Sequence, residues 1–239
     1  MTVQLAQQIL FDKFQREPFH NLYLLNDVQP TTKKYGGTCS DKTLSYLEAA
    51  KSAGLDAHLH SARIGGKEIH RLVRLEIDNQ RYFADIGNGW PSIYLFPAST
   101  PIEYECFGMA YRTQISDGVI TVYHRKNGVE KQQMEIDITE KSDTEIRQSI
   151  ANRFSANITY PFSNQLRFSM IVGQRFLFIR DTRLEIYSDA GYEEISSLNK
   201  SDINTDIMTY FRYDISPLES FIVNKKSAHK QRIALSHDQ

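Results

Sequence analysis

A change of hydrophobic period after Gly54 constrains the fold more than any other feature of this chain. Before that glycine the apolar residues recur at helical spacing, and after it they alternate with polar residues at every second position. Three alternating runs, at 55–64, 72–77 and 82–86, follow one another with no helix between them. Strands joined so closely pair as antiparallel neighbours, since a parallel pair needs a long crossover. The pattern excludes a parallel βαβ series and predicts an antiparallel sheet.

Later alternating runs are expected to extend this sheet, with turn-forming pairs such as Asp117-Gly118 and Asn127-Gly128 between them. These runs lie at 103–114, 118–125, 129–138, 166–172, 175–180 and 183–187. Helices are expected at 2–15, 39–53, 141–153 and 200–211, with a loop between the first two. The sequence therefore predicts an α+β fold with one antiparallel sheet.

Charge and cysteine content exclude several functions. Lys plus Arg number 28 against 29 Asp plus Glu, so a net charge of -1 provides no global basic field for nucleic acid or an anionic membrane. Two cysteines make no disulfide scaffold, and His58 and His60 share a strand face without an evident third metal ligand. We expect a cytoplasmic chain without signal peptide, membrane span or metal, and the sequence leaves the oligomeric state open.

Cys39 is the first candidate for chemistry. Thr38, with Asp41 three residues later, predicts a helix start, and the Gly36-Gly37 loop leads into it. The first turn of a helix favours a thiolate, because its unpaired N–H groups and the positive end of the helix dipole lie there. An imidazole nearby could take the thiol proton and complete a nucleophile. The second cysteine, Cys106, lies in an aromatic strand and is expected in the core.

His70 and Asp85 are the candidate partners of this thiol. In a hairpin with an even-length turn, positions whose numbers sum to an odd value share a face, and 70 plus 85 is odd. A four-residue loop at 76–79 would make them direct cross-strand neighbours, whereas a two-residue turn at 79–80 would offset them by four positions. Structural roles remain open at this point: an inert cysteine, a surface histidine and an aspartate that caps a turn.

Several segments resemble the arylamine N-acetyltransferase family, in particular its N-hydroxyarylamine O-acetyltransferases. Their motifs are Pro18-Phe19-His20-Asn21-Leu22, Tyr35-Gly36-Gly37-Thr38-Cys39, Ala53-Gly54-Leu55 with Ala62-Arg63-Ile64, His70-Arg71-Leu72 and Asp85-Ile86-Gly87-Asn88-Gly89. They are similar to the family's Pro-Phe-Glu-Asn-Leu, Arg-Gly-Gly-x-Cys, post-cysteine strand, histidine strand and Asp-Val-Gly-Phe-Gly segments. Weaker similarity continues through 157–167 and 193–215. Tyr35, Asp41 and Thr43 depart from the family's Arg, Glu and Asn.

The resemblance implies a papain- or transglutaminase-like cysteine-enzyme fold and a Cys39-His70-Asp85 triad. Cys39 would take an acetyl group from acetyl-coenzyme A and pass it to an arylamine, hydrazine or N-hydroxyarylamine in a ping-pong cycle. Gly87 and Gly89 would approach the coenzyme's pyrophosphate. An acceptor pocket could be lined by the aromatic residues Phe19, Tyr35, Phe83 and Trp90, with Tyr94 and Phe96.

The same residues permit other readings. An amide synthase would take its acyl chain from a carrier protein, a transglutaminase-like or papain-like hydrolase would use a peptide, and an inactive member would only bind a partner. The expected domains are 1–66, helical and carrying the nucleophile; 67–140, β-rich and carrying the histidine and aspartate; 141–221, a mixed α/β lid; and 222–239, a basic tail.

Overall fold

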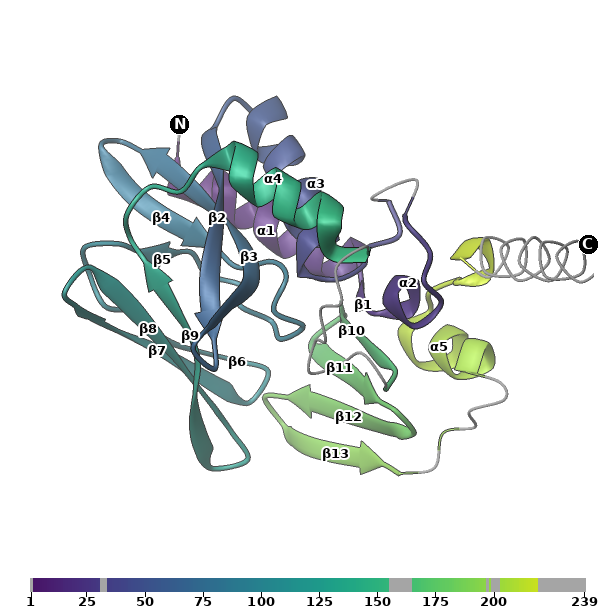
Figure 1. Ribbon diagram of the computed structural model, residues 1–239. Helices are drawn as coiled ribbons and strands as arrows, with labels where there is room; N and C mark the ends of the chain where they lie inside the picture. The colour runs from purple at the N-terminus through teal and green to yellow at the C-terminus, as the bar shows by residue number, and fades with distance from the viewer. Residues whose placement is uncertain (1, 31–33, 155–164, 197, 199–202, 219–239) are drawn as a thin grey trace, which may run out of the picture.

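The computed structural model describes residues 2–30, 34–154, 165–196, 198 and 203–218, and in them helices pack against two antiparallel sheets (Figure 1). The helices are α1 (Val3–Arg16), α2 (Leu22–Leu25), α3 (Cys39–Ser52), α4 (Asp143–Ala151), the 3-10 turn η1 (Asn152–Phe154) and α5 (Ile203–Phe211). The strands of the larger sheet are β2 (Asp56–Ile64), β3 (Lys67–Ile77), β4 (Gln80–Ala84), β5 (Phe96–Pro97), β6 (Glu103–Cys106), β7 (Met109–Ser116), β8 (Val119–Lys126) and β9 (Val129–Asp137). Those of the smaller sheet are β1 (Phe19–His20), β10 (Arg167–Val172), β11 (Arg175–Arg180), β12 (Arg183–Ser188) and β13 (Gly191–Ile195).

The prediction of a single sheet is wrong. The larger sheet has the strand order β5-β4-β3-β2-β9-β8-β7-β6, whereas β10 to β13 form a second sheet that β1 completes in the order β1-β10-β11-β12-β13. Helix α4 leads the chain away from β9, and β10 then pairs with β1 through Phe19 and Ser169. Strand alternation shows which residues lie in a sheet, but it does not show which strands become neighbours.

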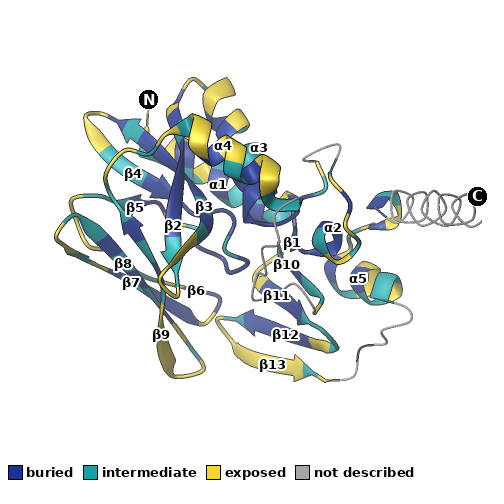
Figure 2. Ribbon diagram, viewed as in Figure 1, coloured by how far each residue is buried: buried dark blue, intermediate teal, exposed yellow. Residues whose placement is uncertain are grey.

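Strand β11 has apolar side chains at four consecutive positions, so it is buried on both faces of the second sheet. Phe176 and Phe178 point to one face and join Trp90 in the main core. Leu177 and Ile179 point to the other face, which α5 covers. Strand β13 is the exposed edge of this sheet, while β11 and β12 are mostly buried (Figure 2). The second sheet therefore contributes one face to the main core and the other face to the core under α5.

Helices α1 and α3 bury their apolar residues against one face of β2 to β4. Leu10 of α1 and Leu47 of α3 contribute to the same core cluster as Val73 and Leu75 of β3. The other face of these strands encloses a separate cluster with the curled half of the sheet, in which Leu72 and residues of β8 and β9 take part. The two halves of the larger sheet join where β2 pairs with β9 through Arg63 and Glu135, and the sheet curls there. No helix among the described residues is long and apolar enough to cross a bilayer.

Several predicted boundaries need correction. The run at 103–114 is two strands, because Phe107 and Gly108 both adopt positive φ and make a tight turn. The loop expected before α3 contains β1 and α2, and β13 was not expected. The segment 1–66 includes β2, which pairs with β3 across the boundary at residue 66. The tail 222–239 and the start of the helix expected at 200–211 lie outside the described residues.

Candidate active site

Cys39 is the first residue of α3, as its sequence context predicts. The backbone N–H and the hydroxyl of Thr38 both donate to Asp41 Oδ2 at 3.0 Å, so the expected capping box is present. The guanidinium of Arg153, from η1, donates to the other oxygen of Asp41. These contacts fix the turn that presents the thiol.

Gly87 packs directly on this turn. A Cβ atom built on Gly87 would lie 2.4 Å from Cys39 Cα and 2.6 Å from its Cβ, closer than atoms can approach. The missing side chain therefore makes room for Cys39 itself. Gly89 is also confined, since its Cβ would lie 3.2 Å from the ring of Phe19.

His70 and Asp85 meet in the interior. His70 Nε2 lies 2.7 Å from Asp85 Oδ1, and the two side chains are 3% and 0% exposed. The hairpin turn is Asp78-Asn79, with Ile77 paired to Gln80, so the register is neither of the two considered from the sequence. His70 and Asp85 are offset by two positions, a diagonal distance that long side chains can span. Their position on one face, expected for any even-length turn, is confirmed.

Burial and charge act in opposite directions on Cys39 and His70. Burial raises the pKa of the Cys39 thiol, but the hydrogen bond and charge of His70, with the nearby Arg71, lower that pKa below its ordinary value overall. Burial also lowers the pKa of His70, yet the charge and hydrogen bond of Asp85, assisted by Cys39, raise it to about 10. Both shifts favour a thiolate beside an imidazolium at neutral pH. Since Nε2 is held by Asp85, Nδ1 is the ring atom that can exchange a proton with the thiol.

The second oxygen of Asp85 is held by residues that sequence reasoning missed. Asn88 Nδ2 donates to Asp85 Oδ2 at 2.8 Å, and Asn88 Oδ1 accepts from Gln133 Nε2 at 2.9 Å. Ser92 Oγ lies farther from the same carboxylate oxygen, at 3.4 Å. Nothing in the local sequence links Gln133 to Asp85, because only the curl of the sheet brings β9 to this loop.

A cavity of about 260 Å³ opens beside the thiol. It is lined by Phe19, Cys39, Ile64, Ile69, His70, Gly87, Asn88, Trp90, Gln133, Arg167, Phe178 and Arg180. Phe19 and Trp90, two of the six aromatic residues expected to form a pocket, are in this wall. Of the two glycines expected to approach a cofactor, Gly87 is in the wall and Gly89 is not.

Phe83 and Tyr35 lie elsewhere, and their assignment to the pocket is corrected. Phe83 is on the same face of the strand as Asp85 but two residues farther into the sheet, where it is 0% exposed and packs in the cluster of Leu72 and Phe96. Tyr35 packs against the core of the second sheet, and its carbonyl oxygen lies 3.0 Å from His20 Nε2. Both aromatic rings serve packing, the more common use of such residues.

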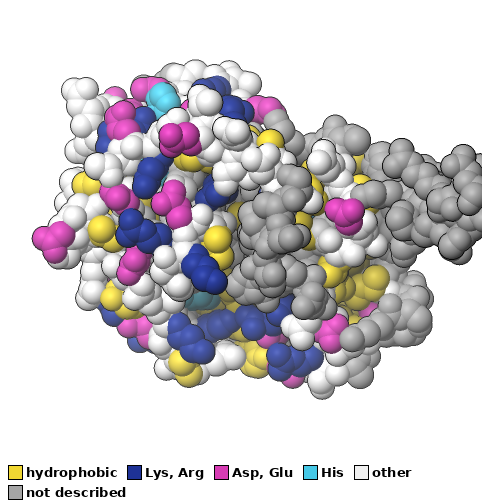
Figure 3. Space-filling view, in the orientation of Figure 1, with side chains coloured by type: hydrophobic (Ala, Val, Ile, Leu, Met, Phe, Trp, Pro, Cys, Tyr) yellow, Lys and Arg dark blue, Asp and Glu magenta, His cyan; other side chains and the backbone are white. Residues whose placement is uncertain are grey.

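Basic side chains lie in and beside the cavity wall. Arg167 and Arg180 are in its wall, and Lys126 Nζ lies 3.4 Å from the ring centroid of Trp90, with the Arg180 guanidinium at 5.1 Å from the same ring. Burial, together with the charge of Arg180, lowers the pKa of Lys126 to about 7. Glu185 offsets part of this charge, 3.3 Å from Arg180 Nε. Figure 3 shows Lys and Arg side chains gathered on the lower middle of the face viewed.

The remaining candidates have structural environments. His58 Nε2 lies 2.8 Å from Asp56 Oδ1, and His60 Nε2 lies 2.7 Å from the carbonyl oxygen of Asp137. No cluster of three His, Cys, Asp or Glu side chains in the described part of the chain is arranged to hold a metal. Cys106 is buried, as expected, and burial raises its pKa to about 12.

Solved structures of arylamine N-acetyltransferases have this fold. The protein from Salmonella typhimurium aligns with a TM-score of 0.75 over 93% of this chain and 92% of its own, at 13% identity. The protein from Mycobacterium marinum aligns with a TM-score of 0.78 over 92% and 90%, at 12% identity, and its complex with CoA with a TM-score of 0.76 over 92% and 92%, at 13% identity. No protein-family model matches the chain, and no curated protein matches it by sequence. The predicted α+β fold is therefore confirmed, and the chain has the fold of these acetyltransferases.

Proposed function

We propose that this chain, which has the fold of the arylamine N-acetyltransferases, is an acetyl-coenzyme A-dependent acyltransferase. Its acceptors would be arylamines, hydrazines or N-hydroxyarylamines. The observation that carries the proposal is that Cys39 and His70 line the same cavity, with the His70 ring held by Asp85 at 2.7 Å and the pKa of the Cys39 thiol lowered by His70. Free Cys39 and Cys106 suit the cytoplasm, where thiols stay reduced.

In the first half-reaction, the Cys39 thiolate attacks the carbonyl carbon of the acetyl thioester. The bond from that carbon to the coenzyme sulfur breaks, and the His70 imidazolium gives its proton to the departing sulfur. In the second half-reaction, the acceptor nitrogen or oxygen attacks the acetyl-cysteine and neutral His70 takes its proton. The thiolate of Cys39 leaves, and the starting ion pair is restored. Asp85 orients His70 and stabilises its positive charge in both steps.

The cavity and the basic side chains in and beside its wall support a phosphate-bearing donor. At about 260 Å³ the cavity is smaller than the roughly 300–1,000 Å³ typical of a whole drug-sized ligand, so we assign it to the acetyl end of the donor and, later, to the acceptor ring. We assign the phosphates to Arg167, Arg180 and Lys126, because guanidinium and ammonium groups bind phosphate oxygens strongly. Gly87 stays in the proposed coenzyme site as part of the wall, whereas Phe19 covers Gly89.

Intact-protein mass spectrometry with acetyl-coenzyme A and no acceptor tests this proposal. We expect one acetyl group on the wild type and none on Cys39→Ala. A thiol that reacts with iodoacetamide but takes no acetyl group would move the donor to an acyl carrier protein or a peptide. A thiol that reacts no faster than a model thiol would refute the enzymatic proposal and leave a binding role.

A further inference from the structure

We propose that Asn88 and Gln133 are positioning residues that hold Asp85, and through it His70, in the orientation that the thiol requires. The inference rests on the proposed function of Cys39. It extends the site to β9, a strand that is far in the sequence from Cys39, His70 and Asp85. It assigns a role to an amide pair in the cavity wall.

Two hydrogen bonds link Gln133 to Asn88 and Asn88 to Asp85, and in both the donor is the residue farther from His70. A carboxylate only accepts hydrogen bonds, so Asn88 must present its NH2 group to Asp85 and its oxygen to the NH2 group of Gln133. With Oδ1 at His70 and Oδ2 at Asn88, the carboxylate cannot rotate without losing a contact. Rotation would turn the imidazole away from Cys39. The amide of Asn88 therefore limits the motion of the histidine through Asp85.

A β-bulge explains why Gln133 reaches this loop. On β9, Met134 pairs with Val122 and Gln132 pairs with Tyr123, so Gln133 is the extra residue between them. A bulged residue leaves the regular alternation, and its side chain is re-aimed. In regular alternation Gln133 and Met134 would point to opposite faces of β9. With Met134 in the core, Gln133 would then point away from Asn88. The bulge therefore lets β9 contribute an amide to the cavity wall while Met134 stays in the core.

The Gln133 amide has a partner on each side. Its NH2 group donates to Asn88 Oδ1 at 2.9 Å. A hydrogen bond between Gln133 and His124 raises the pKa of that histidine, against the larger, lowering effect of burial. An apolar side chain of similar length could not donate to Asn88. A role in orienting Asp85 accounts for the donor at this position.

The test compares Asn88→Ala, Asn88→Asp and Gln133→Leu with Gln132→Ala. Asn88→Asp keeps the shape of Asn88 but replaces the donor with a like charge beside Asp85. Gln132→Ala is the matched control, because Gln132 is an exposed neighbour that bonds to Glu135. We measure the pH profile of Cys39 alkylation by iodoacetamide, and kcat and KM for acetyl transfer. Thermal melting reports folding.

We expect kcat to fall about 10- to 100-fold in Asn88→Ala and Gln133→Leu, and further in Asn88→Asp, because a small misplacement of reacting groups has effects of this size. KM for acetyl-coenzyme A should change less than about twofold, as expected when an interaction serves the transition state rather than ground-state binding. The alkylation midpoint should move to higher pH in each variant, and Gln132→Ala should match the wild type.

Unchanged kcat and alkylation midpoint in folded Asn88→Ala and Gln133→Leu would overturn the proposal, as would a rise in KM alone. If Asn88→Ala does not fold, Gln133→Leu on the neighbouring strand decides. Alkylation needs no acetyl donor, so the positioning role is tested even if acetyl-coenzyme A is the wrong substrate. A wild-type thiol that is itself unreactive would instead be a failure of the proposed function.

Discussion

At the scale of single residues, the site depends on close contact between parts of the chain that are distant in sequence. Gly87 touches the backbone of Cys39, and Asp85, two residues earlier, holds His70. A short loop after β4 thus provides both the space for the Cys39 side chain and the carboxylate that orients His70. Small changes in this loop should affect the thiol directly.

Gly87→Ala should displace Cys39. The new Cβ would overlap Cys39 Cα, so one backbone must move, and overpacking of this kind costs about 1–3 kcal/mol. We expect the alkylation rate of Cys39 at pH 7 to fall at least about tenfold. Gly173→Ala is the control for backbone strain: alanine is strained at its φ of 61°, but a Cβ there meets no atom within 4 Å and does not touch Cys39. Equal alkylation rates in the two variants would contradict the packing argument.

Asp85→Asn should raise the pH at which Cys39 becomes reactive. The charge of Asp85 raises the pKa of His70, and the resulting imidazolium lowers the pKa of Cys39. Without that charge the histidine is neutral near pH 7 and no longer stabilises the thiolate. The midpoint of iodoacetamide alkylation should therefore move toward the value of a free thiol, about 8.5. A midpoint equal to that of the wild type would show that Asp85 does not control the pair.

At the scale of elements, the N-terminus of α3 is secured by a second helical segment. Asp41 caps the helix and also pairs with Arg153 of η1, although both side chains are less than one-tenth exposed. Burial raises the pKa of Asp41, and the Arg153 charge and the Thr38 hydrogen bonds oppose that rise. The turn that carries Cys39 is therefore tied to the segment that follows α4.

Removing one member of this pair should cost more than removing both. Asp41→Ala leaves Arg153 buried without its partner, and breaking a buried pair in this way costs about 3–5 kcal/mol. The double variant Asp41→Ala, Arg153→Met should recover part of that free energy of unfolding, measured by urea titration. Additive losses in the double variant would indicate that the two side chains act independently.

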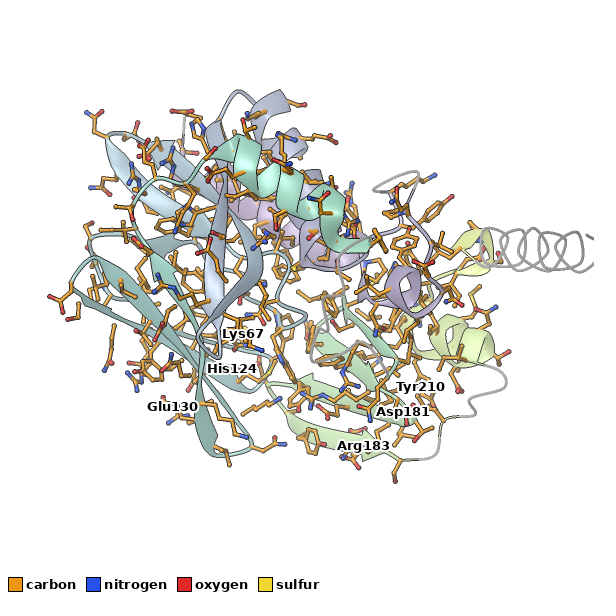
Figure 4. All side chains as sticks on the ribbon, viewed as in Figure 1. Lys67, His124, Glu130, Asp181, Arg183 and Tyr210 are labelled. Atoms are coloured by element: carbon orange, nitrogen blue, oxygen red, sulfur yellow. The ribbon has the colours of Figure 1, made fainter. Side chains whose placement is uncertain are left out.

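At the scale of the whole molecule, buried histidines in both sheets make the free energy of unfolding depend on pH. Burial lowers the pKa of His20 and of His60 to about 4 and that of His124 to about 3. Figure 4 shows His124 on β8, and its ring lies edge-on to Trp90 at 5.2 Å. These histidines belong to three different strands, β1, β2 and β8, so their protonation affects the fold as a whole.

The free energy of unfolding should fall as the pH drops from about 6.5 toward 4. In that range the unfolded chain binds a proton at each of these histidines while the folded chain does not, so acidification favours unfolding. Each histidine contributes at most about 1.4 kcal/mol per pH unit. His124→Phe keeps an aromatic ring against Tyr111 and should reduce the slope of urea-measured stability against pH by one such contribution. The same slope in the variant and the wild type would exclude His124 from this effect.

The sequence by itself determined the local features of this protein. Thr38 and Asp41 begin α3, the alternation of apolar residues marks most of the strands, and the parity of 70 and 85 places His70 and Asp85 on one face. Each of these depends on neighbours a few residues away or on the parity of one turn, so a linear pattern records it.

Only the tertiary structure decided which strands became neighbours and which side chains reached the cavity. It divided the expected sheet in two, placed Phe83 in a core and brought Gln133 to Asn88. It also gathered Arg167 and Arg180 at the cavity beside Cys39. These outcomes depend on how the sheet curls and how the two sheets pack. Such contacts are set by the shape of the whole core, and alternation along a single strand carries no information about them.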